Sequence, residues 1–177
     1  TADAILALTS RKVAAGAAAT ATDALRDNVY DYISPAGGDS RSAGAVAKVA
    51  LVAQVQGRDA TTFHDVDLIA NLSSLKSTTA PNVGRFRDNV AGSDYSGSFS
   101  QSLALLALSH WGSVPADAVQ WLVGLQCANG GYPFSPDEAT GHCASNADAD
   151  NDATAMAIQA LVASGVSGQP GVAAALE

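Results

Sequence analysis

The hydrophobic positions of this chain recur at helical spacing. From about residue 20 onward, Leu25, Val29, Tyr32 and Ile33 fall on one face, which indicates an amphipathic helix with a buried side. Other segments are apolar on nearly every side, as in helices that are buried all round. No stretch alternates with a period of two residues, so we predict an all-α protein. The expected helices cover residues 1–10, 20–33, 43–56, 65–75, 99–110, 116–126 and 153–163.

Apolar and amphipathic segments alternate four times, which indicates a repeated helix pair. The apolar segments share an Ala-Leu step that recurs at uneven intervals, as expected for one unit joined by loops of different length. The steps are Ala7-Leu8, Ala50-Leu51, Ala107-Leu108 and Ala160-Leu161. We predict one domain over residues 1–177, with about four helix pairs in two layers and the apolar helices inside. A plain helical bundle is the alternative.

The stretch between residues 126 and 152 joins the last two expected helices and contains most of the candidate chemistry. It holds a Gly-Gly-aromatic turn, both cysteines and an acidic run. Asp152 directly precedes an apolar segment, so we expect its carboxylate to cap that helix. The helix that follows is expected to be buried on all sides.

Cys127 and Cys143 are the two cysteines of the chain. A disulfide between them would stabilise the fold by roughly 3 kcal/mol and would imply an oxidising compartment. A zinc site of Cys127, His142, Cys143 and a nearby Asp is an alternative, although the spacing matches no zinc-ligand pattern. Two free buried cysteines are the remaining possibility. We favour the disulfide.

Charge and hydropathy narrow the range of partners. The net charge of −8, the pI of about 4.5 and the lack of a Lys/Arg cluster argue against nucleic-acid and anionic-membrane partners. No apolar run reaches the roughly 18 residues of a membrane-spanning helix. No signal peptide is visible, and the chain begins inside a helical pattern, so we expect a mature or trimmed fragment.

Several motifs resemble the repeats of terpenoid cyclase/protein prenyltransferase-like α/α toroids. Gln126-Cys-Ala-Asn-Gly-Gly-Tyr is similar to the Q-x-x-x-G-G-aromatic turn between outer and inner helices of that family. Asp152-Ala-Thr-Ala-Met-Ala-Ile-Gln-Ala-Leu resembles the start of an inner helix. Gly84-Arg-Phe-Arg-Asp, with Asp94-Tyr-Ser and Gln101-Ser-Leu-Ala after it, resembles the preceding repeat. The similarity is greatest to extracellular bacterial members with prenyltransferase/squalene-cyclase-type repeats.

The resemblance implies an α/α toroid, a ring that closes with about six helix pairs. The smaller number of pairs here implies a fragment, an open arc or an arc completed by a partner. An open arc would expose the apolar flank of its last inner helix and permit self-association. The residues from Ala173 to Glu177 are expected to start a new outer helix, which favours the fragment.

The acidic run invites comparison with the D-x-D-D motif of class II terpene cyclases, whose middle Asp protonates the substrate. Asp148-Ala-Asp150-Asn151 ends in Asn instead of Asp, so we assign no catalytic residue. Asp148, Asp150 and Asp152 are also a candidate calcium site, although the Gly and Glu of an EF-hand loop are missing. A loop that caps the next helix is the favoured interpretation.

Four aromatic residues lie in or beside inter-helix loops: Tyr95, Trp111, Tyr132 and Phe134. If they share one rim, a flat apolar or sugar ligand can stack on them. We therefore hypothesise a non-catalytic α/α-toroid module of a secreted or surface protein. It would bind a small molecule, glycan or protein at the rim or mouth and need no cofactor. The alternatives are a structural spacer and an enzyme, either terpene cyclase/prenyltransferase-like or polysaccharide-cleaving, that uses the acidic cluster.

Overall fold

The computed structural model describes residues 1–90 and 93–166, and this part of the chain is mostly helical. The expected helix at residues 173–177 lies outside these residues. Two strands of two residues each form a small antiparallel sheet, so the prediction of an all-α protein is confirmed. The elements are α1 (Ala2–Ser10), α2 (Ala15–Asp27), α3 (Val29–Ile33), α4 (Ala43–Val55), α5 (Leu68–Ser74), α6 (Ser98–Trp111), α7 (Ala116–Gly124), β1 (Tyr132–Pro133), a 3-10 turn (Asn146–Asp148), β2 (Ala149–Asp150) and α8 (Asn151–Ala163).

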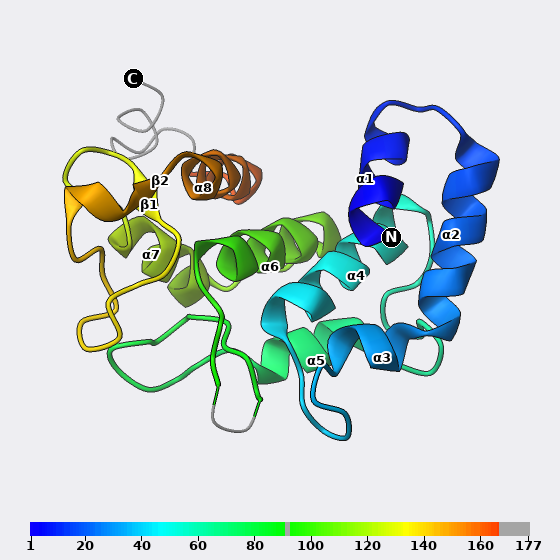
Figure 1. Cartoon of the computed structure of the whole chain (residues 1–177), viewed down its shortest axis with the longest axis horizontal. Coiled ribbons are helices and arrows are strands. Elements are labelled where there is room, and N and C mark those ends of the chain that lie inside the picture. Colours follow the sequence, from blue (N-terminus) through cyan, green and yellow to red (C-terminus); the bar gives the residue numbers. More distant parts are fainter. Residues whose placement is uncertain (91–92, 167–177) are drawn as a thin grey trace.

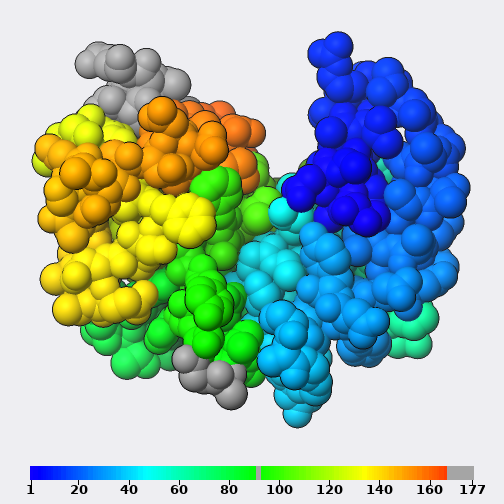
Figure 2. Space-filling model, in the orientation of Figure 1, coloured from blue at the N-terminus to red at the C-terminus, as the bar shows by residue number. Residues whose placement is uncertain are grey.

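The helices form two layers (Figure 1). Helices α1, α4, α6 and α8, called the inner helices below, pack side by side in that order. The outer helices cover them, with α2 against α1, α5 against α4 and α7 against α6. A notch lies between α8 and α1 in the space-filling view, and α4 and α6 form its floor (Figure 2).

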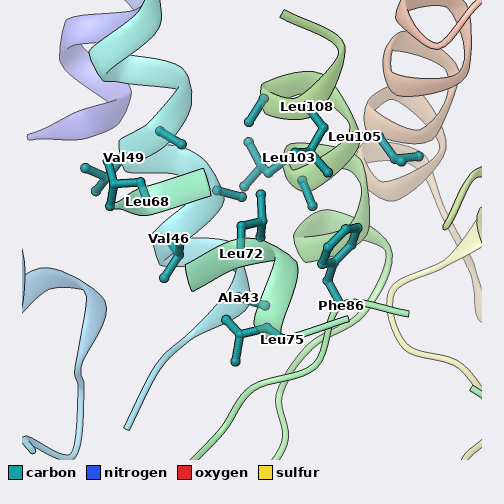
Figure 3. Close-up of a cluster of buried hydrophobic side chains, with 14 of the residues drawn as sticks. Ala43, Val46, Val49, Leu68, Leu72, Leu75, Phe86, Leu103, Leu105 and Leu108 are labelled. Carbon is teal, nitrogen blue, oxygen red and sulfur yellow. The ribbon is translucent and has the colours of Figure 1, made fainter. Parts of the chain in front are cut away.

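The hydrophobic core lies between the inner and outer layers (Figure 3). Val46 and Val49 of α4 meet Leu68 and Leu72 of α5, while Leu105 of α6 is also fully buried. Burying one such side chain contributes about 1.5–3 kcal/mol. The apolar inner helices therefore hold the two layers together.

The segment predicted as one helix from residue 20 is two helices. α2 starts earlier, at Ala15, and ends before Asn28, whose backbone leaves the helical region at φ −118°. The Asn28 side chain donates to the Ala24 carbonyl and so satisfies one of the last carbonyls of α2. Leu25 and Val29 are buried as expected, although they now lie on separate helices.

Helix α5 begins later than predicted, at Leu68 instead of residue 65. His64 and Asp65 have φ values of +51° and +63° and form a tight turn, across which Phe63 and Val66 pair. Asp67 then caps α5, since its carboxylate accepts a hydrogen bond of 2.7 Å from the Ala70 N–H. The sequence pattern could not reveal this turn because left-handed His and Asp residues are uncommon.

Two predictions about helix α8, its cap and its complete burial, are wrong. Its N-cap is Asp150, which accepts a hydrogen bond of 2.7 Å from the Ala153 N–H, and Asp152 lies exposed inside the first turn. The helix is also not buried on all sides, because Val162 is 49% exposed and Ala155 is exposed as well. Ala155, Gln159 and Val162 are spaced so that they share one exposed face of the helix.

Two equivalent hydrogen bonds support a structural repeat. The Phe86 N–H donates to Gln101 Oε1 at 2.9 Å, and the Tyr132 N–H donates to Thr154 Oγ1 at 2.9 Å. In both cases the aromatic residue of the turn binds a polar side chain in the first turns of the next inner helix. Gly84 lies two residues before Phe86 and has φ +90°. A Cβ at this position would lie 2.2 Å from the Asp117 carbonyl oxygen. The turn therefore requires glycine.

Candidate functional site

The four candidate aromatic residues do not share one rim. Phe134 lies at the start of α6, where its carbonyl accepts a hydrogen bond of 3.1 Å from the Ser98 N–H and its ring contacts Phe99. Trp111 is the last residue of α6, roughly 20 Å away along the helix axis. Tyr132 is only 1% exposed and belongs to the core. The condition under which all four residues would form one binding surface is therefore not met, and each is considered separately.

Tyr95 is the most exposed of the four candidate aromatic residues. The residue is 79% exposed, the highest value among the large hydrophobic residues described. It borders a pocket of about 370 Å³ between the first turn of α4, the end of α3 and the loop that precedes α6. This volume is within the usual range for small-molecule sites. The pocket is lined by Tyr32, Pro35, Ala36, Ser42, Ala45, Asp88, Val90 and Tyr95.

Asp88 connects Tyr95 to the start of α4. One oxygen of the Asp88 carboxylate accepts a hydrogen bond of 2.8 Å from the Ala43 N–H, which is one of the free donors of the helix start. The other oxygen accepts a bond of 3.2 Å from the Tyr95 N–H. A single carboxylate therefore fixes the backbone of Tyr95 relative to α4, and the positive end of the helix dipole favours its charge.

Asp94 holds the same loop from the other side of Tyr95. Its carboxylate accepts hydrogen bonds from the Ser96 N–H at 3.0 Å, from the Asp88 N–H at 3.2 Å and from Arg87 Nε at 2.6 Å. Burial tends to raise the pKa of Asp94, but the bonds from Ser96 and Arg87 outweigh it and lower the pKa below its usual value of 3.8. Asp94 is therefore ionised at neutral pH.

Arg85 lies beneath this loop and is 1% exposed. Its guanidinium donates to the Ser96 carbonyl at 2.6 Å and to the Glu138 carboxylate at 3.0 Å, and Asp94 is 3.6 Å away. Its Cζ lies 5.6 Å from the centre of the Trp121 ring. Such a buried cation needs these partners, because an unpaired charge in the interior is costly. Arg85 therefore ties the Tyr95 loop to the segment around Glu138.

The carboxylates of the acidic run have different surroundings. Asp150 caps α8, whereas Asp148 and Asp152 are exposed. Within residues 1–90 and 93–166, no three His, Cys, Asp or Glu side chains are grouped as a metal ion would require. The calcium site proposed from the sequence stays a prediction.

The disulfide prediction is confirmed. Cys127 and Cys143 are bonded, and their Cα atoms are 5.2 Å apart. The zinc alternative is wrong, because both sulfur atoms are joined to each other and no thiolate is available. His142 instead has Nδ1 at 2.9 Å from the Gly124 carbonyl oxygen. The bridge closes the loop that carries β1, and β2 and the cap of α8 follow shortly after Cys143.

Two important side chains were not recognised in the sequence. Arg85 stands between Gly84 and Phe86, where a charged residue in an apolar turn was the available signal. Asp88 follows in the same motif, and only the fold shows that it reaches α4. Tyr32 was assigned to the core, yet it is partly exposed and lines the pocket.

No helix in the described part of the chain is long and apolar enough to span a membrane. A scan against protein-family models, a search of curated proteins and a search of solved structures each found no match to the chain.

Proposed function

We propose that this protein is a non-catalytic binding module that takes a ligand with a flat apolar face, an aromatic or sugar ring, in the Tyr95 pocket. The observation that carries the proposal is the contrast between the side chain and the backbone of Tyr95. Tyr95 is 79% exposed, while Asp88 fixes its backbone N–H and Asp94 holds the next residue, Ser96.

A fixed backbone matters because binding is weakened by the entropy of ordering mobile groups. Tyr95 presents its ring from a backbone that is already held, so less ordering is needed when a ligand stacks on it. Tyr32 lines the same pocket, together with the apolar side chains of Pro35 and Ala45. Aromatic rings and small apolar groups of this kind suit a flat ligand.

We also propose that the helix pairs belong to an α/α toroid of the terpenoid cyclase/protein prenyltransferase-like type, and that the protein is secreted or displayed on a cell surface. The side-by-side order of the inner helices and the equivalent bonds of Gln101 and Thr154 support the first proposal. The Cys127–Cys143 bridge supports the second, because disulfides persist in oxidising compartments. The pocket lies beside the N-terminal end of α4.

The roles of the carboxylates favour binding over acid catalysis. Asp150 uses its carboxylate as a helix cap, and Asp88 uses both oxygens to hold backbone N–H groups. A general acid needs a transferable proton within reach of the substrate. Asp88 instead holds the loop that lines the pocket, and Asp150 stabilises the start of α8.

The test uses 3-phenyl-1-propanol and cellotriose as probes, with binding measured by saturation-transfer NMR and isothermal titration calorimetry. We expect at least one probe to bind, and Tyr95→Ala to weaken that binding roughly tenfold through loss of the stacking ring. The matched control is Tyr30→Ala, because Tyr30 is 48% exposed but does not line the pocket. Binding that Tyr95→Ala and Tyr30→Ala affect equally would contradict the proposal, and so would the failure of both probes.

A further inference from the structure

Lys48 stands out among the inner helices. It is the single Lys or Arg in the sequences of α1, α4, α6 and α8. It lies five residues after the first residue of α4, and the equivalent positions of α6 and α8 hold Leu103 and Met156. A cation therefore occupies a position that is apolar in the two neighbouring repeats.

Packing does not account for this lysine. The side chain of Lys48 is 25% exposed, so most of it is removed from water. Its ammonium group lies 2.8 Å from the Asp3 carboxylate of α1, and the Asp3 side chain is 77% exposed. An ion pair with one exposed partner contributes little to stability. An apolar residue, as in α6 and α8, would serve the fold equally well.

Lys48 does not line the Tyr95 pocket itself but lies one helical turn beyond a residue that does. Ala45 lines the pocket and precedes Lys48 by three residues on α4, a rise of about 4.5 Å. Tyr32 lines the pocket too, and the charges of Lys48 and Asp3 both act on its phenol. Burial raises the pKa of Tyr32, Lys48 lowers it and Asp3 raises it. Tyr32, which lines the pocket, is therefore the residue that links the Lys48–Asp3 ion pair to the ring-binding surface.

We propose that the ligand of this pocket combines a ring with a carboxylate, and that Lys48 binds the carboxylate in competition with Asp3. The inference rests on the proposed binding role of Tyr95. The Asp3 side chain shows that a carboxylate can approach the Lys48 ammonium group to hydrogen-bonding distance. Because Asp3 is exposed, it can turn into solvent when a ligand replaces it, and the charge-assisted bond is then made to the ligand.

The test compares three ligands that share a ring and a three-carbon chain: 3-phenylpropanoate, 3-phenyl-1-propanol and 3-phenylpropylamine. Affinities are measured by isothermal titration calorimetry at low salt, where charge interactions are least screened. We expect the carboxylate to bind roughly tenfold more tightly than the alcohol, and the amine to bind most weakly.

Two variants identify the groups responsible. Lys48→Met introduces the residue that α8 has at the equivalent position, so the fold should tolerate it, and it should abolish the preference for the carboxylate. Asp3→Asn removes the competing carboxylate and should strengthen binding of 3-phenylpropanoate several-fold while leaving the alcohol unchanged. If Lys48→Met does not fold, Asp3→Asn still tests the inference. Asp3 is exposed, so its replacement should leave the fold intact.

The outcomes separate this inference from the proposed function. If the alcohol binds in a Tyr95-dependent manner and the carboxylate has no advantage, Lys48 does not select the ligand and this inference alone fails. If Lys48→Met weakens carboxylate and alcohol equally, the inference fails in the same way. If none of the three ligands binds, the ring-binding role of the pocket is contradicted as well.

Discussion

Gln101 donates a hydrogen bond of 2.8 Å from Nε2 to the backbone carbonyl of Ala118, and so joins the inner helix α6 to the outer helix α7. The same side chain donates to the Gly84 carbonyl at 3.0 Å and accepts from the Phe86 N–H at 2.9 Å. Gln101 is fully buried, so water cannot replace it at any of these three backbone groups.

Replacement of Gln101 should therefore cost substantial stability. Gln101→Leu leaves the three backbone groups buried and unpaired, and we expect the free energy of unfolding to fall by roughly 2–4 kcal/mol. Urea denaturation followed by circular dichroism measures this change. The control is Gln159→Leu on the exposed side of α8, which should change stability by less than about 0.5 kcal/mol. Equal effects of the two variants would contradict the proposed role of Gln101.

The cap of α8 gives a prediction that distinguishes two neighbouring carboxylates. Asp150→Ala removes the acceptor of the Ala153 N–H and should destabilise the fold by about 1 kcal/mol. Asp152→Ala removes only a favourable interaction with the helix dipole and should cost less than about 0.5 kcal/mol. Urea midpoints of both variants check the order. A larger loss of stability in Asp152→Ala would indicate that Asp152 is the cap, as the sequence pattern suggested.

The disulfide should contribute to stability and leave no free thiol. Thiol titration of the denatured, unreduced protein is expected to find no reactive sulfhydryl, since Cys127 and Cys143 are joined. The double variant Cys127→Ser, Cys143→Ser should lose about 3 kcal/mol, because the open loop gains entropy in the unfolded chain. Two reactive thiols per chain would contradict the bridge and remove the main support for a secreted protein.

The lowered pKa of Asp94 predicts a specific dependence on pH. The folded state holds the charged carboxylate more strongly than the unfolded state, whose pKa is near 3.8. The stabilising contribution is therefore complete well above pH 3.8 and is lost as the pH falls through the lower, folded-state pKa. The difference in unfolding free energy between wild type and Asp94→Asn should be largest near neutral pH and shrink in acid. A difference that is constant down to about pH 2.5 would show that Asp94 acts only through its shape.

The helical class and most helix positions could be predicted from the sequence because the signals are local. The apolar segment of α4 and the Pro115 that precedes α7 determine their helices within a few residues. The alignment of equivalent positions between the repeats was harder to predict from the sequence. Leu108 and Leu161 each lie ten residues after the first residue of their helix, whereas Leu51 lies eight residues after Ala43. The shared Ala-Leu step therefore aligned α4 with α6 two residues out of register.

The candidate site depended on contacts that the sequence pattern does not contain. Tyr95 was recognised as a loop aromatic residue, but its position beside α4 follows from Asp88, which is distant from Ala43 in the sequence. Phe134 and Trp111 looked equivalent because both lie in or beside inter-helix loops, yet they lie at opposite ends of α6. The preference for Asp150 over Asp152 as a cap depends on where the helix backbone begins, and both residues are suited to the role.

The most direct test of the central claim, ligand binding at the Tyr95 pocket, is amide NMR of ¹⁵N-labelled protein during titration with 3-phenyl-1-propanol. We predict that the amide signals of Tyr95, Ala36 and Ala45 shift together and saturate with a single dissociation constant, while that of Trp111 stays in place. Shifts that are largest around Trp111, or that rise linearly over the whole surface without saturation, would contradict a binding site at Tyr95.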